Sequence, residues 1–309
     1  MVSLCIQKQA PCVRTTHARA NPVPGLSAAV RALIHPRLER LRTAVGVEPD
    51  LMVPGKMIRT GLAGRMEESG ACRVSRETIA ATCAATELVH TASLLHDDVI
   101  DEAPLRRRRP ALWTCIGRSA AVLMGDALLC EAIDTVLRVE HGQYAALFVA
   151  KVRQVVEAEA RQELLERGQA LDTAACLRMA QEKTGPLFSF VTEVCAGSDW
   201  HLRHAMGRAG ELIGAAYQLA DDMLDVIGSE DRAGKTLGTD GLRGKFTLPQ
   251  GGPPRLDETA DMVDRLLDEA VAALAEWPAA QQGAASFICN DLKAVFAAQG
   301  MAFSKDEVG

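Results

Sequence analysis

The sequence has few aromatic residues and no clear strand alternation, and both shortages weigh against a β-sheet protein. Phe, Trp and Tyr make up 4% of the 309 residues, whereas strands favour aromatic and β-branched side chains. Alanine, the best helix former, is abundant. The composition therefore favours helix, and 48% hydrophobic residues are ample for a sizeable core.

Long apolar runs and paired cysteines are also missing. No run approaches the roughly 18 residues that a membrane-spanning helix needs, and the longest candidate, AAVLMGDALLC, is interrupted by Asp126. The nine cysteines are scattered singly, without C-x-x-C pairs or zinc spacing. Most, such as Cys83 and Cys130, are interpreted as small core residues. A cytoplasmic, reducing location is therefore expected.

The chain lacks a basic surplus, since its net charge is −6. This charge argues against general nucleic-acid binding, which needs a basic surface. The first 38 residues contain no acid, a composition that loosely suits an organelle transit peptide. The alternative, a disordered N-terminal segment over residues 1–26, is the one we expect.

Apolar residues recur at three- and four-residue spacing along most of the remaining chain, which predicts helices. The predicted helices span 27–45, 76–100, 119–139, 143–167, 173–196, 203–228 and 257–276. Breaks between them carry Gly or Pro, and no linker is long enough to divide the chain. We therefore expect residues 27–309 to form one all-α domain, a multi-helix bundle around a deep central cavity.

Two aspartate clusters of the same spacing each follow an apolar helical stretch: Asp97, Asp98 and Asp101, then Asp221, Asp222 and Asp225. Carboxylates one helical turn apart on the same face repel each other unless a cation lies between them. Mg²⁺ suits them, because it combines a few carboxylates with substrate phosphates. A single cluster could be a solvated helix end; two clusters indicate a diphosphate ligand.

Basic residues accompany both clusters: Lys56, Arg59, Arg106, Arg107, Lys183, Lys235 and Lys245. Arginine holds phosphate with two donors at once, and lysine acts as a mobile point charge. The run of four arginines at 106–109 could instead be a nuclear-localisation or nucleic-acid patch. The adjacent acids and the negative net charge oppose that interpretation.

With these motifs the chain resembles the trans-isoprenyl diphosphate synthases, the polyprenyl synthetase family, in its geranylgeranyl and longer-chain types. The matching stretches are GKMIR, ELVHTASLLHDDVIDEAPLRRRRP, GDALL, KTGPLF, YQLADDMLD and GKTLGTDGLRGKFTLP, spread over roughly residues 50–250. The resemblance implies a prenyltransferase that condenses isopentenyl diphosphate with an allylic diphosphate, head to tail and in trans geometry. It also implies a homodimer, and the negative net charge excludes nucleic acid as an expected partner.

The resemblance further implies a role for each matched residue. Mg²⁺, more than one ion per site, would be held by Asp97, Asp98, Asp101, Asp221, Asp222 and Asp225. Arg106, Lys183 and Lys245, with Lys235 nearby, would neutralise the allylic diphosphate. Isopentenyl diphosphate would be bound by Lys56, Arg59, His90 and Arg107. His90 precedes Asp97 by two helical turns on the same face, although a buried core histidine is its alternative.

The aspartates other than Asp225, together with Lys183, are the expected catalytic residues, and Thr184 and Gln218 are further polar candidates facing the cavity. Phe188 and Tyr217 are candidates for stabilising a carbocation through their ring faces, or else core residues. In the family, a bulky residue four or five places upstream of the first motif shortens the product. Here Ser93 and Ala92 are small, which implies a product of twenty carbons or longer.

Two other functions stay open. A partner-dependent or non-catalytic subunit of a heteromeric synthase is favoured by the C-terminal part, which looks shortened after residue 249. The intact second aspartate cluster argues against it, because such subunits often lose one cluster. A class I terpene cyclase is opposed by DDMLD and by the Lys56, Arg59 and His90 set for a second diphosphate.

Overall fold

The computed structural model describes residues 3–4, 24–47, 55–106, 109–169, 171–227, 253–298 and 302–303. Over these residues the chain is almost entirely helical, which confirms the expected fold class. The helices are α1 (Pro24–Val45), α2 (Ile58–Glu68), α3 (Arg76–Ile100), α4 (Leu112–Ile116), α5 (Arg118–Arg138), η2 (Val139–Gly142), α6 (Ala145–Arg161), η3 (Gln162–Glu166), α7 (Thr173–Lys183), α8 (Gly185–Cys195), α9 (Trp200–Ile227), α12 (Pro253–Ala272), α13 (Pro278–Ser286), η4 (Phe287–Leu292) and α14 (Lys293–Ala298).

Strands in the described part of the chain are two residues long. β2 (Leu105–Arg106) and β3 (Arg109–Pro110) form an antiparallel hairpin. β1 (Ser3–Leu4) pairs in parallel with β4 (Ala302–Phe303) and lies against α12. The hairpin follows the first aspartate cluster and turns the chain back toward α3.

Helix formation follows the apolar spacing. In α1 the buried side chains are Leu26, Val30, Ile34 and Leu38, four residues apart along one face. α3 begins where the hydroxyl of Ser75 accepts a hydrogen bond from the backbone N–H of Thr78 at 3.2 Å, so that one of the unpaired N–H groups at the helix start is satisfied.

The helix predicted over 173–196 is divided into α7 and α8 at Thr184. Pro186 has no backbone N–H and cannot continue the preceding helix, but it fits the first turn of a new one. The break places two predicted site residues, Lys183 at the end of α7 and Thr184 at the junction.

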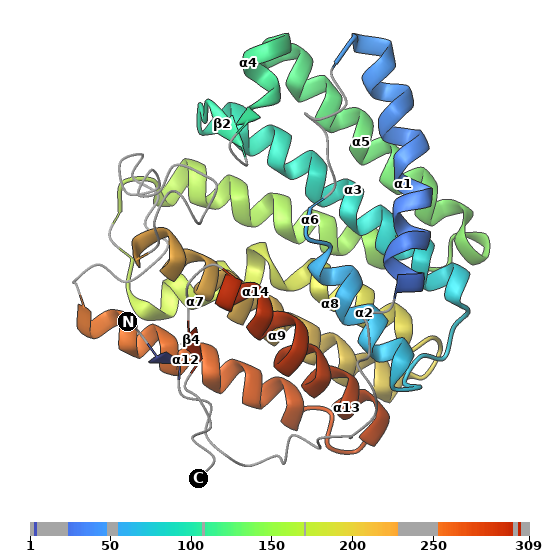
Figure 1. Cartoon of the computed structure of the whole chain (residues 1–309), viewed down its shortest axis with the longest axis vertical. Coiled ribbons are helices and arrows are strands. Elements are labelled where there is room, and N and C mark those ends of the chain that lie inside the picture. The colour runs from blue at the N-terminus through green and yellow to red at the C-terminus, as the bar shows by residue number, and fades with distance from the viewer. Residues whose placement is uncertain are drawn as a thin grey trace.

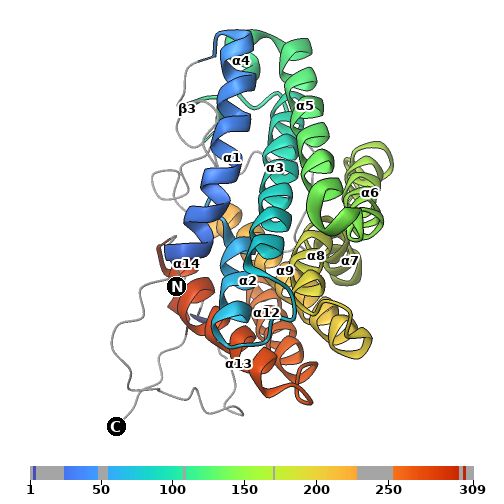
Figure 2. The same cartoon turned by 90° about the vertical axis from the view of Figure 1, so that its right-hand side faces the viewer.

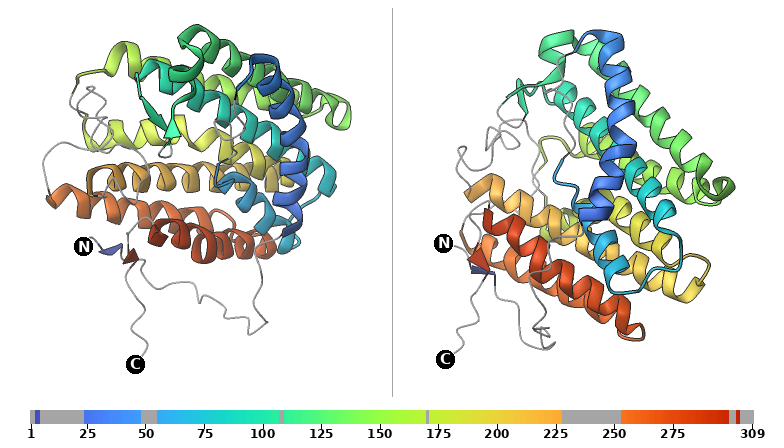
Figure 3. Two further views of the ribbon diagram at one scale, coloured as in Figure 1. Left: turned by 45° about the horizontal axis from the view of Figure 1, so that its top comes forward. Right: turned by 45° about the vertical axis from the view of Figure 1, so that its right-hand side comes forward.

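The long helices pack in layers. α3 packs extensively against α5, α9 against both α8 and α12, and α2 against α8. α5 and α12 lie on opposite sides of the bundle, with α8 and α9 between them (Figure 1). Figure 2 shows α1, α3 and α5 side by side, and Figure 3 shows α12 and α14 on the side away from α5. No helix among the described residues is long and apolar enough to cross a membrane.

Glycine allows α8 and α9 to approach each other closely. A Cβ atom on Gly214 of α9 would lie 2.8 Å from the Cα atom of Gly185 in α8, and one on Gly210 would lie 2.8 Å from the carbonyl oxygen of Phe188. Any side chain at these positions would force the two backbones apart. The α8–α9 contact therefore depends on glycine.

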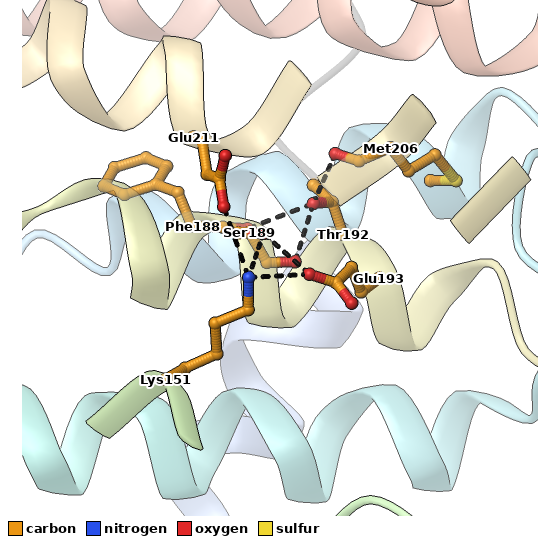
Figure 4. Close-up of polar contacts among 7 residues, drawn as sticks. All are labelled: Lys151, Phe188, Ser189, Thr192, Glu193, Met206 and Glu211. Carbon is orange, nitrogen blue, oxygen red and sulfur yellow. Dashed lines mark hydrogen bonds and ion pairs between the residues drawn. The ribbon is translucent and has the colours of Figure 1, made fainter. Parts of the chain in front are cut away.

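A buried polar network holds α6 against the α8–α9 pair (Figure 4). The Lys151 ammonium group lies 2.8 Å from Glu193 Oε1 and donates to the Ser189 hydroxyl at 2.9 Å and to Glu211 Oε1 at 3.3 Å. Ser189 in turn donates to Glu193 at 2.8 Å. The lysine charge, buried to all but 9% of its surface, is thus compensated by partners from two helices.

Two expectations concern regions that lie largely outside the described residues. These regions are most of the N-terminal segment 1–26 and the stretch after residue 249 up to the start of α12. The domain boundaries stay a prediction.

Candidate active site

The first aspartate cluster lies at the C-terminal end of α3, where Asp101 is the capping residue. The carbonyl end of a helix carries a partial negative charge, so carboxylates there are doubly unfavourable. The last turn of α3 contains no basic residue. Charge compensation must therefore come from elsewhere.

Arg106 on β2 supplies part of that compensation. Its Nε and Nη2 atoms both donate to Oδ1 of Asp98, at 2.8 and 2.5 Å. Asp98 is 2% exposed, whereas Asp97 and Asp101 are half-buried. The β2–β3 hairpin thus brings Arg106 back to the aspartates that precede it, close enough for charge-assisted hydrogen bonds.

The second cluster lies near the C-terminal end of α9. Asp222 is 7% exposed, and its Oδ1 accepts a hydrogen bond from the Gln218 side-chain amide at 2.8 Å. Gln218 in turn accepts a hydrogen bond from the Thr184 hydroxyl at 2.6 Å. The structure therefore brings together three predicted site residues, Thr184 from the α7–α8 junction and Gln218 and Asp222 from α9. Gln218 lies one helical turn beyond Gly214.

Lys183 contacts two residues that sequence reasoning missed. Its ammonium group lies 2.6 Å from Glu159 Oε2 and donates to Gln162 Oε1 at 2.7 Å. Glu159 and Gln162 lie three residues apart, on one face of a helix. Because their contact with Lys183 is tertiary, no local signal identifies them.

The GKMIR segment places Arg59 in the interior. Arg59 is 8% exposed, its guanidinium lies 5.1 Å from the centre of the Phe188 ring, and its Nε has no hydrogen-bond partner among the described residues. Burial lowers the pKa of Arg59, while the nearby Glu87 carboxylate opposes this. The charge on α2 is therefore held close to α8 and is available for a further acceptor.

Glu87 is a second residue that sequence reasoning missed. It lies 3% exposed on α3 and accepts a hydrogen bond from the Thr60 hydroxyl at 3.0 Å. Burial raises the pKa of Glu87, and Arg59 and Thr60 oppose the rise. Its signal would have been an acid within the apolar stretch of 76–100.

The remaining predicted site residues are described by their position in the chain and their exposure, or lie outside the described ranges. Lys56 is exposed and precedes Met57, which has a left-handed φ of 54° at the start of α2. His90 is half-buried on α3. Arg107, Lys235, Lys245 and the side chain of Asp225 lie outside the described residues.

The two candidates for stabilising a carbocation have aromatic neighbours. The rings of Phe188 and Tyr217 are 6.0 Å apart, and Tyr217 also stacks on Phe296 at 5.9 Å. Phe188 is fully buried and has Arg59 over its ring. A role for Phe188 in packing and in holding Arg59 is therefore the better supported one.

The donor set suits a hard divalent cation, because it consists of carboxylate oxygens, two of them on buried residues. Within the described ranges, however, no three His, Cys, Asp or Glu side chains gather closely enough to hold an ion by themselves. Further oxygen ligands would have to come from a bound molecule, as is usual for Mg²⁺.

Comparison with known proteins agrees with the fold and the motifs. The polyprenyl synthase of Caulobacter crescentus, solved with calcium and isoprenyl diphosphate, matches with a TM-score of 0.68 and 26% identity over 85% of this chain and 93% of that one. The profile of the polyprenyl synthetase family matches residues 48–259.

Two curated relatives show partial coverage. The (2E,6E)-farnesyl diphosphate synthase of Mycobacterium tuberculosis is 36% identical over 214 residues, which is 62% of this chain and 58% of that protein. The octaprenyl diphosphate synthase of Haemophilus influenzae is 34% identical over 172 residues, or 54% and 52%. The chain thus spans a little over half the length of these relatives.

The fold and the site define an all-helical protein of the isoprenoid synthase fold. The family profile covers well over half of the chain, and the chain belongs to the polyprenyl synthetase family.

Proposed function

We propose that this protein is a Mg²⁺-dependent trans-prenyltransferase that condenses isopentenyl diphosphate with an allylic diphosphate, head to tail, to give a polyprenyl diphosphate. The observation that carries the proposal is that a buried aspartate near the end of each of two helices is hydrogen-bonded to a cationic or polar side chain. Arg106 holds Asp98, and Thr184 reaches Asp222 through Gln218. Family membership supports the same reaction.

The six aspartates would hold the metal. They are Asp97, Asp98, Asp101, Asp221, Asp222 and Asp225. Bound Mg²⁺ would supply positive charge to the diphosphate oxygens and make the diphosphate a better leaving group. Calcium in the Caulobacter crescentus structure is consistent with a divalent cation at such a site.

The cations would exchange partners on substrate binding. Arg106 and Lys183 already pair with carboxylates, Asp98 and Glu159, so the free protein keeps both cations ordered. An allylic diphosphate would compete with those carboxylates, with Lys235 and Lys245 as further cations. Isopentenyl diphosphate would be held by Lys56, Arg59, His90 and Arg107.

The reaction needs no protein nucleophile. Departure of the diphosphate leaves an allylic cation, which the double bond of isopentenyl diphosphate attacks, and loss of a proton then restores an alkene. The departing diphosphate is a suitable base for that proton. The protein's own contribution is to position both diphosphates, to stabilise the developing charge, and to exclude water that would trap the cation.

A product of twenty carbons or longer is supported by the small side chains upstream of the first cluster. Ala92 is buried and Ser93 half-buried on α3, with Val89 and Thr86 on the preceding turns. A growing chain beneath the aspartates would meet no bulky group on this face. Relatives with farnesyl, geranylgeranyl and octaprenyl products all match, so product length rests on these residues.

A homodimer is our expectation for assembly. Exposed apolar side chains lie along the neighbouring helices α5, α6 and η3: Leu123, Leu137, Val149, Val156 and Leu164. A second copy is the partner we propose for this face, because such a stripe is costly in water. A cytoplasmic location stays our expectation, because the singly scattered cysteines of the sequence suit a reducing compartment.

The test is a direct assay. Purified protein is incubated with Mg²⁺, labelled isopentenyl diphosphate and, separately, allylic starters of five, ten, fifteen and twenty carbons, and the dephosphorylated products are sized. We expect a labelled ladder ending at one length, and a loss of about 100-fold or more for Asp98→Asn with Asp222→Asn. Glu157→Gln, an exposed acid on α6, is the matched control.

Two outcomes would contradict the proposal. No incorporation with any starter, from protein that keeps its helical circular dichroism, would favour a subunit that needs a partner synthase. Conversion of an allylic diphosphate alone into a cyclic hydrocarbon would favour a terpene cyclase.

A further inference from the structure

Three cysteines that are far apart in the sequence meet at one place in the fold. Cys72 lies in the turn between α2 and α3, Cys83 lies on α3, and Cys195 is the last residue of α8. The Cys72 thiol raises the pKa of both Cys195 and Cys83, which indicates that the three side chains lie near one another. All three are free thiols.

The backbones that carry Cys72 and Cys195 are also in direct contact. The N–H of Arg73 donates to the carbonyl oxygen of Cys195 at 2.7 Å. A Cβ atom on Gly197 would lie 3.2 Å from both Arg73 Cβ and Val74 Cγ1. One hydrogen bond between adjoining peptide groups brings the two Cα atoms close to the 4.4–6.8 Å separation that a disulfide requires.

The three thiols differ in accessibility. Cys83 and Cys195 are 1% and 0% exposed, whereas Cys72 is half-buried and reaches the surface. The neighbouring Cys72 thiol and burial both raise the pKa of Cys195, and burial raises the pKa of Cys83. The two buried groups therefore stay as thiols at neutral pH, and Cys72 is the one that a dissolved reagent meets first.

We propose that Cys72 and Cys195 form a peroxide-reactive dithiol that closes to a disulfide. The Cys72 thiolate attacks a hydroperoxide: an S–O bond forms, the O–O bond breaks, and an alcohol or water leaves. The Cys195 thiol then condenses with the Cys72 sulfenic acid: an S–S bond forms, the S–O bond breaks, and the thiol proton passes to the departing hydroxyl group, which leaves as water. Two thiols are oxidised and one hydroperoxide is reduced.

The disulfide would join α2 to α8 at one end. These helices pack side by side, and Arg59 contacts Phe188 near their N-terminal ends. Cys72 and Cys195 lie past or at their C-terminal ends, about 10–14 Å further along the two helices. The bond would close a long loop and stabilise the folded state without touching the diphosphate-binding residues.

The test treats the whole protein with one equivalent of hydrogen peroxide, blocks remaining thiols, digests with trypsin without reduction, and measures peptide masses. The three cysteines fall in separate peptides, 66–73, 77–106 and 184–203. We expect 66–73 joined to 184–203 and a rise in Tm of roughly 5 °C that a reductant reverses. Neither readout depends on prenyl transfer.

Variants separate the proposed pair from other thiols. Cys72→Ser should abolish the linked peptide and the Tm rise, while Cys83→Ala and the exposed Cys115→Ser should keep both; helical circular dichroism checks that each variant folds. A 66–73 peptide joined to 77–106 instead, or Cys72 oxidised only to sulfenic or higher acids, would overturn the assignment of Cys195 as the partner.

Discussion

At the residue scale, Asp264 is a buried acid that has no part in the proposed reaction. It lies on α12 with 4% of its surface exposed, and neither carboxylate oxygen has a hydrogen-bond partner within the described residues. Burial raises the pKa of Asp264 to about 7, Asp268 and Asp261 add to the rise, and Lys293 opposes it. An ionised Asp264 is therefore unfavourable in the folded state.

The sign of the pH effect follows from this raised pKa. Unfolded chains release the aspartate proton near pH 4, whereas the folded protein keeps it until about pH 7. The folded state binds more protons between these limits, so the contribution of Asp264 to stability falls as pH rises from 4 to 7 and stays low above 7.

Asp264→Asn should remove this pH dependence. Relative to the parent protein, the variant should gain roughly 2–4 kcal/mol in free energy of unfolding between pH 5 and pH 8, because the amide never ionises. Urea unfolding at several pH values measures the difference. Asp257→Asn, an exposed aspartate on the same helix, is the control. Parallel pH profiles for Asp264→Asn and the parent would contradict the raised pKa.

At the element scale, the glycine contact between α8 and α9 positions the second aspartate cluster. Gly214 touches Gly185, which follows Thr184, and Gln218 lies one turn further along α9. The close approach therefore allows Thr184 to reach Gln218, and Gln218 to reach Asp222. The Lys151 network bonds α6 to the same helix pair.

Gly214→Ala should force the two helices apart. The added methyl group would meet the Gly185 backbone at 2.8 Å, which cannot move aside as a flexible side chain would. We expect a loss of about 2 kcal/mol in unfolding free energy and a raised KM for the allylic substrate. Thermal unfolding and steady-state kinetics measure both.

Gly61→Ala is the matched control on α2. There a Cβ atom would meet only the Phe287 ring, at an ordinary 3.5 Å. In a helix interior with room, alanine should be neutral or stabilise by up to ~1 kcal/mol. If both substitutions had equal effects, the close approach of α8 and α9 would not be what limits position 214.

At the scale of the whole molecule, the proposed reaction would make product length depend on the space that several helices leave open beneath the aspartates. Ser93 is half-buried on α3, one turn before Asp97. Ser93→Phe should place a large ring in the path of a growing chain and shorten the product, while activity with the shortest starter is kept. Sizing of dephosphorylated products measures this.

Ser93→Ala is the control, because it removes the hydroxyl but adds no bulk, and it should leave product length unchanged. Buried Ala92 is a poorer position, since a phenylalanine there would overpack the core by about 1–3 kcal/mol. An unchanged product from a folded Ser93→Phe variant would mean that another helix forms the end of the cavity.

Much of the local structure could be predicted from apolar spacing. The helix predicted over 76–100 is α3, and that over 119–139 differs from α5 by one residue. The prediction of one continuous helix over 173–196 was wrong, because α7 ends before Gly185 and Pro186, where α8 begins. α2 was not predicted as a helix, since its pattern contains two glycines and little apolar periodicity.

Within the candidate site, the acids and the cations could be predicted from the sequence, because each motif is contiguous in the chain. The contacts that these residues make could not be predicted. Glu159 and Gln162 act on Lys183 from another helix, and Glu87 lies near Arg59 from α3. The cysteines show the same limit: Cys83 and Cys130 were both interpreted as small core residues, and Cys83 is buried whereas Cys130 is exposed.

The sequence alone determined the helical class, the spacing of both aspartate clusters and the family resemblance, because these depend on neighbours within a few turns of one chain segment. Only the tertiary structure decided which faces meet. It brought Arg106 onto Asp98, Thr184 to Gln218, and Cys72 to Cys195. Those contacts depend on close packing between helices, where the presence or absence of a single methyl group decides how near two backbones lie.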